Sequence, residues 1–197
     1  MLAGLDASVE RFMVDHRVAW LTTAMRATTH LGNAKWLAWL VVGVGFAYVV
    51  LRRSFRPLLF LVVAAGGAGL IAHVLKVAIG RHRPPPSGVV VHGASFPSGH
   101  ATGAAAAFGA VALVVVAGRA PATRRAGWAL AVTIALAVAF SRVYLGVHWL
   151  TDVIGGLALG WGWLFAVSRA ESRLLRHTGG VEGGHLAQDA GRGLEQG

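Results

Sequence analysis

Apolar residues dominate five stretches of the chain, each close to the length that crosses a bilayer. A transmembrane helix needs about 20 predominantly apolar residues. Stretches of this kind occupy residues 34–51, 58–79, 101–118, 127–145 and 149–167. The pattern therefore predicts an all-α fold, a polytopic transmembrane helical bundle with five strong spans, in one membrane-embedded domain over residues 34–176.

The segment before the first span mixes charged and apolar positions. Over residues 9–31 the two kinds of residue separate onto different sides at helical spacing. A helix of this kind lies in the headgroup region of a membrane, with Trp20 at the interface. We predict an N-terminal amphipathic interfacial helix within residues 1–33, and the alternative is a sixth span.

The end of the chain has a third kind of composition. Residues 177–197 contain seven glycines, three acids and almost no large apolar side chains. Such a segment buries too little surface to offset the entropy of ordering. It predicts a disordered tail.

Small residues are frequent inside the spans. Residues 104–107 are all alanine, and glycines are paired at Gly66/Gly69 and Gly156/Gly160. Within lipid, small residues allow helices to approach closely. We therefore predict tight helix packing at each of these places.

The composition restricts the class of protein further. Hydrophobic residues make up 55% of the chain and charged residues 13%, against about 25% charged in an average soluble domain, which excludes an ordinary water-soluble globule. The absence of cysteine excludes disulfides and cysteine-ligated metal sites.

The net charge is +10, yet the cations lie between apolar stretches and form no continuous stripe, so no nucleic acid partner is predicted. The expected partner is the lipid bilayer.

The first of three polar clusters lies at the end of the second span. Lys76 and Arg83 are seven residues apart, about two helical turns, and Pro84 ends the helix. Alone, such cations are explained by snorkelling to the membrane surface.

The second cluster is Phe96-Pro97-Ser98-Gly99-His100, directly before the third span. Ser98 suits the N-cap of a transmembrane helix. The same geometry can bind an anion, because free N–H groups point outward at a helix N-terminus and Gly99 permits close approach. His100 then stands beside the anion.

The third cluster contains Arg142, His148 and Asp152. His148 and Asp152 are four residues apart, so the imidazole can donate to the carboxylate on one helix face. Such a pair can be structural, but it also holds a catalytic histidine in one tautomer. Asp152 is the only carboxylate between Asp15 and Glu171, and with Arg142 nearby the functional interpretation is favoured.

Five crossings place all three clusters on the same membrane face. Fixed cations beside two histidines suit a phosphate ester, because they neutralise charge on a transferring phosphoryl group. A single carboxylate does not match a magnesium or two-metal site. Neither a metal ion nor any other cofactor is predicted.

The order Lys-x6-Arg-Pro, Pro-Ser-Gly-His and Ser-Arg-x5-His-x3-Asp, between Lys76 and Asp152, resembles the three-part signature of the type 2 phosphatidic acid phosphatase superfamily. The resemblance implies a metal-independent membrane phosphatase that works through a phosphohistidine. It implies that His148 is the nucleophile, oriented by Asp152, and that His100 is the general acid and base. The phosphate-binding residues that it implies are Lys76, Arg83, Ser98, Gly99 and Arg142.

The resemblance and the membrane location together predict a lipid phosphate substrate. Its candidates are polyprenyl pyrophosphate or monophosphate, phosphatidic acid and phosphatidylglycerol phosphate. Undecaprenyl pyrophosphate is favoured, because small members of the family often resemble undecaprenyl pyrophosphate phosphatases. The loop residues Arg81, His82 and His92 either read the headgroup or, more simply, are solvated. The alternatives to hydrolysis are a lipid phosphotransferase and a non-catalytic lipid-binding or translocating protein.

The arginines predict an orientation. Short loops rich in arginine remain cytoplasmic. The loops opposite the three clusters carry Arg52, Arg53, Arg56, Arg119, Arg124 and Arg125. We therefore predict an integral protein of the plasma (inner) membrane whose active site faces the extracytoplasmic side and whose C-terminal tail is cytoplasmic.

Overall fold

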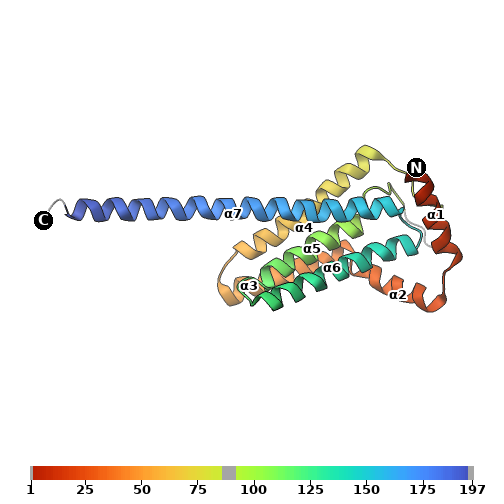
Figure 1. The fold of residues 1–197 in the computed structure, drawn as a ribbon, viewed down its shortest axis with the longest axis horizontal. Coiled ribbons are helices and arrows are strands. Elements are labelled where there is room, and N and C mark those ends of the chain that lie inside the picture. The colour runs from red at the N-terminus through yellow and green to blue at the C-terminus, as the bar shows by residue number, and fades with distance from the viewer. Residues whose placement is uncertain (1, 86–91, 195–197) are drawn as a thin grey trace. The chain divides into compact units, whose positions relative to one another are not determined.

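The computed structural model describes residues 2–85 and 92–194, and all regular secondary structure in these ranges is helical. The prediction of an all-α fold is thereby confirmed. The helices of this part of the chain, shown in Figure 1, are α1 (Leu2–Asp15), α2 (Ala19–His30), α3 (Ala34–Arg52), α4 (Arg56–Ile79), α5 (Gly99–Val115), α6 (Pro121–Tyr144) and α7 (Leu150–Leu194).

The chain forms two compact units, Met1–Leu164 and Phe165–Gly197. The first unit contains all the predicted site residues. In the second unit, α7 continues with local contacts such as the Arg169 guanidinium over the Phe165 ring, 4.6 Å from its centroid. The backbone of α7 is described to Leu194, across most of the segment for which the sequence predicts disorder, but the side chains after Leu174 are not described. A disordered tail over residues 177–197 therefore stays a prediction.

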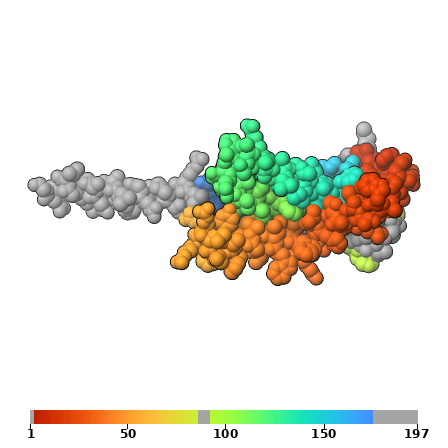
Figure 2. All heavy atoms as spheres, turned by 90° about the horizontal axis from the view of Figure 1, so that it is seen from below, coloured from red at the N-terminus to blue at the C-terminus, as the bar shows by residue number. Residues whose placement is uncertain are grey.

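Four helical segments in the described residues are long and apolar enough to cross a membrane: α3, α4, α6 and Leu150–Leu174 of α7. Exposed apolar side chains, Trp36, Trp39 and Phe46 among them, cover α3, whose outer face is orange in Figure 2. These features are those of an integral membrane protein.

The third predicted span, over residues 101–118, corresponds to α5, which is apolar but has only 17 residues. It packs against α3, α4 and α6, and residues 104–107 are fully buried. Because neighbouring helices enclose α5, it presents little surface to lipid. The structure thus supports four candidate spans around a shorter apolar helix, and the prediction of five strong spans is not confirmed.

The prediction of one helix over residues 9–31 is wrong, because the structure has two helices, α1 and α2, separated at His16–Val18. Tyr144 holds this break. The Arg17 Nε donates to the Tyr144 carbonyl at 3.1 Å, and the Val18 N–H donates to the Tyr144 hydroxyl at 3.1 Å. With 14 and 12 residues, α1 and α2 are each shorter than the roughly 20 residues of a span. Both pack against α6.

The glycine pairs do not share one role. A Cβ at Gly156 would lie 2.7 Å from the Ser98 carbonyl oxygen, and one at Gly160 would lie 2.5 Å from the Thr102 carbonyl oxygen. This pair therefore allows α7 to approach the backbone of α5, as predicted. A Cβ at Gly66 or Gly69 would meet nothing within 4 Å, because both glycines line a cavity. The prediction of tight helix packing at this pair is therefore wrong.

The close approach at Gly160 can be tested with a matched pair of variants. Gly160→Ala places a methyl group against backbone that cannot yield easily, and such overpacking costs about 1–3 kcal/mol of unfolding free energy. Gly162→Ala makes the same change in α7, at an exposed position with nothing within 4 Å. Thermal unfolding in detergent should show a melting temperature lowered by several degrees for Gly160→Ala and unchanged or raised for Gly162→Ala. Equal melting temperatures for the two variants would contradict the packing.

Candidate active site

The three polar clusters meet at one end of the first unit, where α4 and α6 end and α5 and α7 begin. Arg83 joins the first cluster to the third, because its Nη1 donates to the Val147 carbonyl at 2.7 Å and lies 3.2 Å from His148 Nε2. The Ser98 N–H donates to the Asp152 carbonyl at 3.0 Å and joins the second cluster to the third. Helices that alternate in direction thus bring distant parts of the sequence together.

His148 and Asp152 form a buried pair. His148 Nδ1 lies 3.3 Å from Asp152 Oδ2, which also accepts from the Trp149 N–H at 3.0 Å, and the side chains are 3% and 0% exposed. With Nδ1 facing the carboxylate, Nε2 faces Arg83. Burial lowers the pKa of His148 to about 4, although its hydrogen bond with Asp152 acts in the opposite direction. The ring is therefore neutral near pH 7, and its outer nitrogen has the lone pair that a nucleophile needs.

The cationic side chains of the site are held by neutral acceptors. Lys76 Nζ donates to the carbonyls of Ala94 at 2.8 Å and Ser95 at 3.1 Å. Arg83 Nε donates to the Gly93 carbonyl at 2.9 Å, and burial lowers the pKa of this guanidinium. These contacts fix the cations without cancelling their charge.

The Arg142 side chain also bonds a neutral acceptor, which belongs to α2. Its Nη1 donates to the Thr29 hydroxyl at 2.7 Å. Its Nε is buried without a hydrogen-bond partner among the described residues, and so is the Ser98 hydroxyl. An unsatisfied buried donor is costly, so both atoms mark a place suited to a polar ligand.

Ser98 stands at the N-cap of α5, as predicted, but its side chain makes no capping hydrogen bond. The backbone carbonyl of Ser98 instead accepts from the N–H and the hydroxyl of Thr102, at 2.9 and 3.0 Å. A Cβ at Gly99 would come near only the Lys76 side chain, at 3.9 Å, so space in front of this helix end is open.

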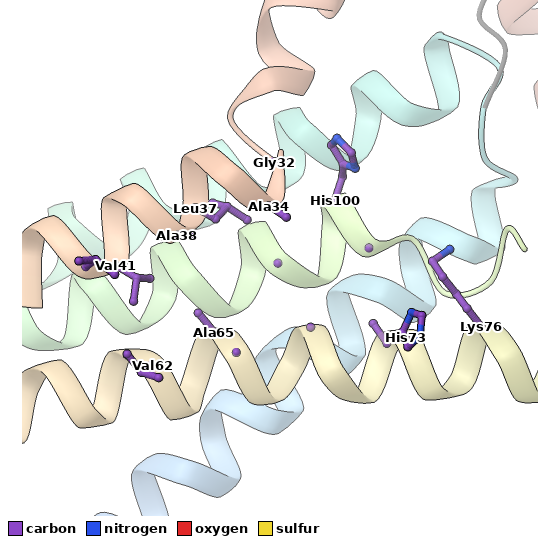
Figure 3. Close-up of a pocket in the computed structure, with 16 residues that line it drawn as sticks. Gly32, Ala34, Leu37, Ala38, Val41, Val62, Ala65, His73, Lys76 and His100 are labelled. Carbon is purple, nitrogen blue, oxygen red and sulfur yellow. The ribbon is translucent and has the colours of Figure 1, made fainter. Parts of the chain in front are cut away.

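His100 lies on the side of the site nearest α3. Its ring lies 3.1 Å from the position that a Cβ on Gly32 would occupy, and no hydrogen bond joins it to His148 in the described structure. Figure 3 shows His100 and Lys76 at one end of a cavity of about 550 Å³. Away from this end the cavity is apolar and passes between α3, α4 and α5, with a lining that includes Leu37, Val41, Val62 and Ala65.

Three further residues support the site without being singled out by the sequence, namely Asp6, Thr151 and Thr29. The prediction that Arg81 is a solvated loop residue is wrong, because its guanidinium bonds Asp152 at 2.6 Å and Asp6 at 2.7 Å. The one signal in the sequence is that Asp152, the only acid between Asp15 and Glu171, stands near an excess of cations. His92 is exposed, as expected for a solvated loop residue.

The donor set also bears on metal binding. In the described residues no three His, Asp or Glu side chains are grouped so that they could hold a metal ion. Lys76, Arg83 and Arg142 bond neutral acceptors, so they form a site for an anion with oxygen atoms, and phosphate is such an anion.

Comparison with known proteins identifies the protein family. Residues 57–176 match the model of the PAP2 superfamily, and the chain belongs to this family. Phosphatidylglycerophosphatase B of Bacillus subtilis is 35% identical over 174 residues, which cover 87% of this chain and 85% of that protein. Decaprenylphosphoryl-5-phosphoribose phosphatase of Mycobacterium tuberculosis is 34% identical over 160 residues, covering 78% and 81%.

Solved structures agree with this assignment. The crystal structure of a transmembrane PAP2 type phosphatidylglycerolphosphate phosphatase from Bacillus subtilis superposes with a TM-score of 0.81 and 34% identity, covering 87% of this chain and 86% of that one. The structure of LpxE from Aquifex aeolicus has a TM-score of 0.63 at 21% identity, covering 84% and 95%, and shows the shared fold.

The neutral state of His148 can be measured directly. Because burial lowers the pKa of this ring to about 4, it should stay unprotonated as the pH falls from 7 to 5 and gain a proton only near pH 4. Nitrogen-15 NMR of ring-labelled protein in detergent, with His148→Ala to assign the signal, measures this titration. Asp152→Asn should lower the pKa further by weakening the opposing hydrogen bond. A His148 ring that titrates near pH 6.5 would contradict the buried environment.

Proposed function

We propose that the chain is a membrane phosphatase that hydrolyses a lipid phosphate or pyrophosphate through a phosphohistidine intermediate. The observation that carries this proposal is the position of Lys76, Arg83 and Arg142. All three are held by neutral acceptors beside the His148–Asp152 pair. Their charge is therefore available for the oxygen atoms of a phosphoryl group.

In the proposed first step, the Nε2 lone pair of His148 attacks phosphorus and the bond from phosphorus to the leaving oxygen breaks. Arg83 Nη1, which faces Nε2 at 3.2 Å, turns to a phosphoryl oxygen. Asp152 stabilises the positive charge that develops on the ring. His100 is neutral without an anion beside it, because burial and the nearby cations lower its pKa to about 3, so binding of the anionic substrate must first raise this pKa and let His100 take up a proton from solvent. The imidazolium then gives that proton to the leaving alcohol or phosphate.

The second step reverses these roles. His100, now unprotonated, takes a proton from water as the water oxygen attacks phosphorus. The bond from phosphorus to Nε2 breaks, the electron pair returns to His148, and inorganic phosphate leaves. Through both steps Lys76, Arg83, Arg142, Ser98 and the Gly99 N–H bind the phosphoryl oxygens, so the charge is stabilised where it develops.

The apolar cavity supports a lipid substrate. The cavity begins beside His100 and Lys76 and continues between α3, α4 and α5. A lipid whose hydrocarbon tail lies in this cavity would have its headgroup at the site. The relatives named above act on phosphatidylglycerophosphate and on a decaprenylphosphoryl sugar phosphate. Phosphatidylglycerol phosphate is therefore the first candidate substrate, ahead of phosphatidic acid and polyprenyl phosphates.

Phosphate release from this panel of lipids tests the proposal. Purified protein in detergent with excess EDTA should release phosphate from at least one of them, because the proposed steps use no metal. His148→Ala should lower the rate by about 10⁴-fold, as loss of a nucleophile does in other hydrolases. His92→Ala, which changes an exposed histidine, should retain the wild-type rate.

Two outcomes would contradict the proposed function. One is activity that EDTA abolishes and magnesium restores, and the other is wild-type activity in folded His148→Ala protein. Transfer of the phosphoryl group to an added lipid alcohol, without free phosphate, would show a phosphotransferase instead.

We further propose that the site faces the extracytoplasmic side of the plasma (inner) membrane, with the C-terminal tail inside. The end opposite the site carries six arginines near the connections from α3 to α4 and from α5 to α6, and arginine-rich short loops stay in the cytoplasm. Arg11 and Arg26, in α1 and α2, lie at the site end and oppose this preference.

Cysteine labelling measures this orientation, because the chain has no cysteine of its own. Ser8→Cys introduces an exposed thiol on α1 at the site end, and Thr123→Cys introduces one in the first turn of α6 at the other end. In intact cells an impermeant maleimide should label Ser8→Cys and spare Thr123→Cys, while both react after lysis. The reverse pattern would overturn the proposed orientation.

A further inference from the structure

Asp6 is a buried acid that the proposed chemistry does not use. It lies in α1, far in sequence from residues 57–176 that match the family, and is 2% exposed. Its Oδ1 accepts from the Thr151 N–H at 3.0 Å. Its Oδ2 accepts from the Thr151 hydroxyl and from Arg81 Nη2, both at 2.7 Å. A buried carboxylate is costly unless it is paired, and Asp6 is fully paired.

Arg81 connects Asp6 to the candidate catalytic pair. Its Nη1 donates to Asp152 Oδ1 at 2.6 Å and to the Thr151 hydroxyl at 2.7 Å. The other oxygen of Asp152 faces His148 Nδ1. The planar guanidinium therefore links two carboxylates in a fixed geometry, and a continuous series of polar contacts runs from α1 to the His148 ring.

The charges of this series have a consequence for His148. If Arg81 were paired with Asp152 alone, the two charges would cancel, and the carboxylate would stabilise a positive imidazole less well. Asp6 gives Arg81 a second negative partner, so the three side chains together carry a formal charge of −1. Burial would raise the pKa of Asp6, but hydrogen bonds from Thr151 and Arg81 lower it below its usual value, which keeps Asp6 ionised.

We propose that Asp6 is a positioning residue for phosphoryl transfer, acting through Arg81 to orient the Asp152 carboxylate and to preserve its negative charge against His148. This inference rests on the proposed function. Asp6 touches neither the apolar cavity nor the phosphate-binding cations, so its contribution falls on the chemical step and not on lipid binding. A merely structural role, in which Asp6 only fastens α1 to the start of α7, would change stability and leave the chemical step alone.

The test compares Asp6→Asn with Asp15→Asn, which makes the same change at an exposed position of α1. For the lipid phosphate that wild-type protein hydrolyses fastest, Asp6→Asn should lower kcat by about tenfold and leave KM within about twofold. Asp15→Asn should leave both unchanged. Arg81→Lys, which keeps the charge but lacks the planar fork that holds the two carboxylates in a fixed geometry, should also lower kcat selectively. Thermal unfolding confirms that each assayed variant is folded.

A second readout needs no turnover. The proton on His148 Nδ1 gives an NMR signal whose position reports its hydrogen bond to Asp152, and Asp6→Asn or Arg81→Lys should shift it while Asp15→Asn should not. If the wild-type protein releases no phosphate, the proposed function fails, but this shift still tests the contact series. Should Asp6→Asn not fold, Arg81→Lys decides by the same two readouts. An unchanged kcat or an unchanged signal in a folded variant would overturn the proposal.

Discussion

Positive charge among apolar helices must be held in place, and at this site it is held without being neutralised. Lys76, Arg83 and Arg142 donate to backbone carbonyls and to a threonine hydroxyl. A carboxylate beside each cation would also stabilise the ligand-free protein. Such a carboxylate would, however, compete with an anionic ligand for the cation. The site therefore keeps an excess of positive charge at the head of an apolar cavity, an arrangement that suits the proposed lipid phosphate substrate.

The few acids are used differently. Asp152 faces His148 and Arg81, and Asp6 faces Arg81 and Thr151, so that negative charge gathers on the Nδ1 side of the His148 ring, opposite the Arg83 guanidinium at Nε2. The ring then has a carboxylate at Nδ1 and a guanidinium at Nε2. This polarity suits a nucleophile that becomes positively charged when it takes a phosphoryl group. Helices α1 and α2 contribute to it from outside the region that defines the family.

The sequence predicted which polar residues meet at one end of the bundle better than it predicted the elements around them. Helix ends alternate between membrane faces, so counting spans was enough to bring Lys76, His100 and His148 to one end. The break between α1 and α2 could not be foreseen, because it depends on Tyr144, more than 120 residues away in sequence. Arg81 looked solvated for a similar reason, since its partners lie on α1 and α7. Gly66 and Gly69 looked like packing glycines because periodicity does not distinguish a helix contact from a cavity wall.

In the proposed mechanism His148 Nε2 is the atom that accepts the phosphoryl group. Rapid quenching of the enzyme with a lipid labelled in its phosphate, followed by mass spectrometry of peptides under alkaline conditions, detects this intermediate. We expect an acid-labile, base-stable label on the peptide that contains His148, absent from His148→Ala protein. A label on Ser98 or His100 instead, or turnover by the wild type with no labelled protein at any quench time, would contradict the proposed mechanism.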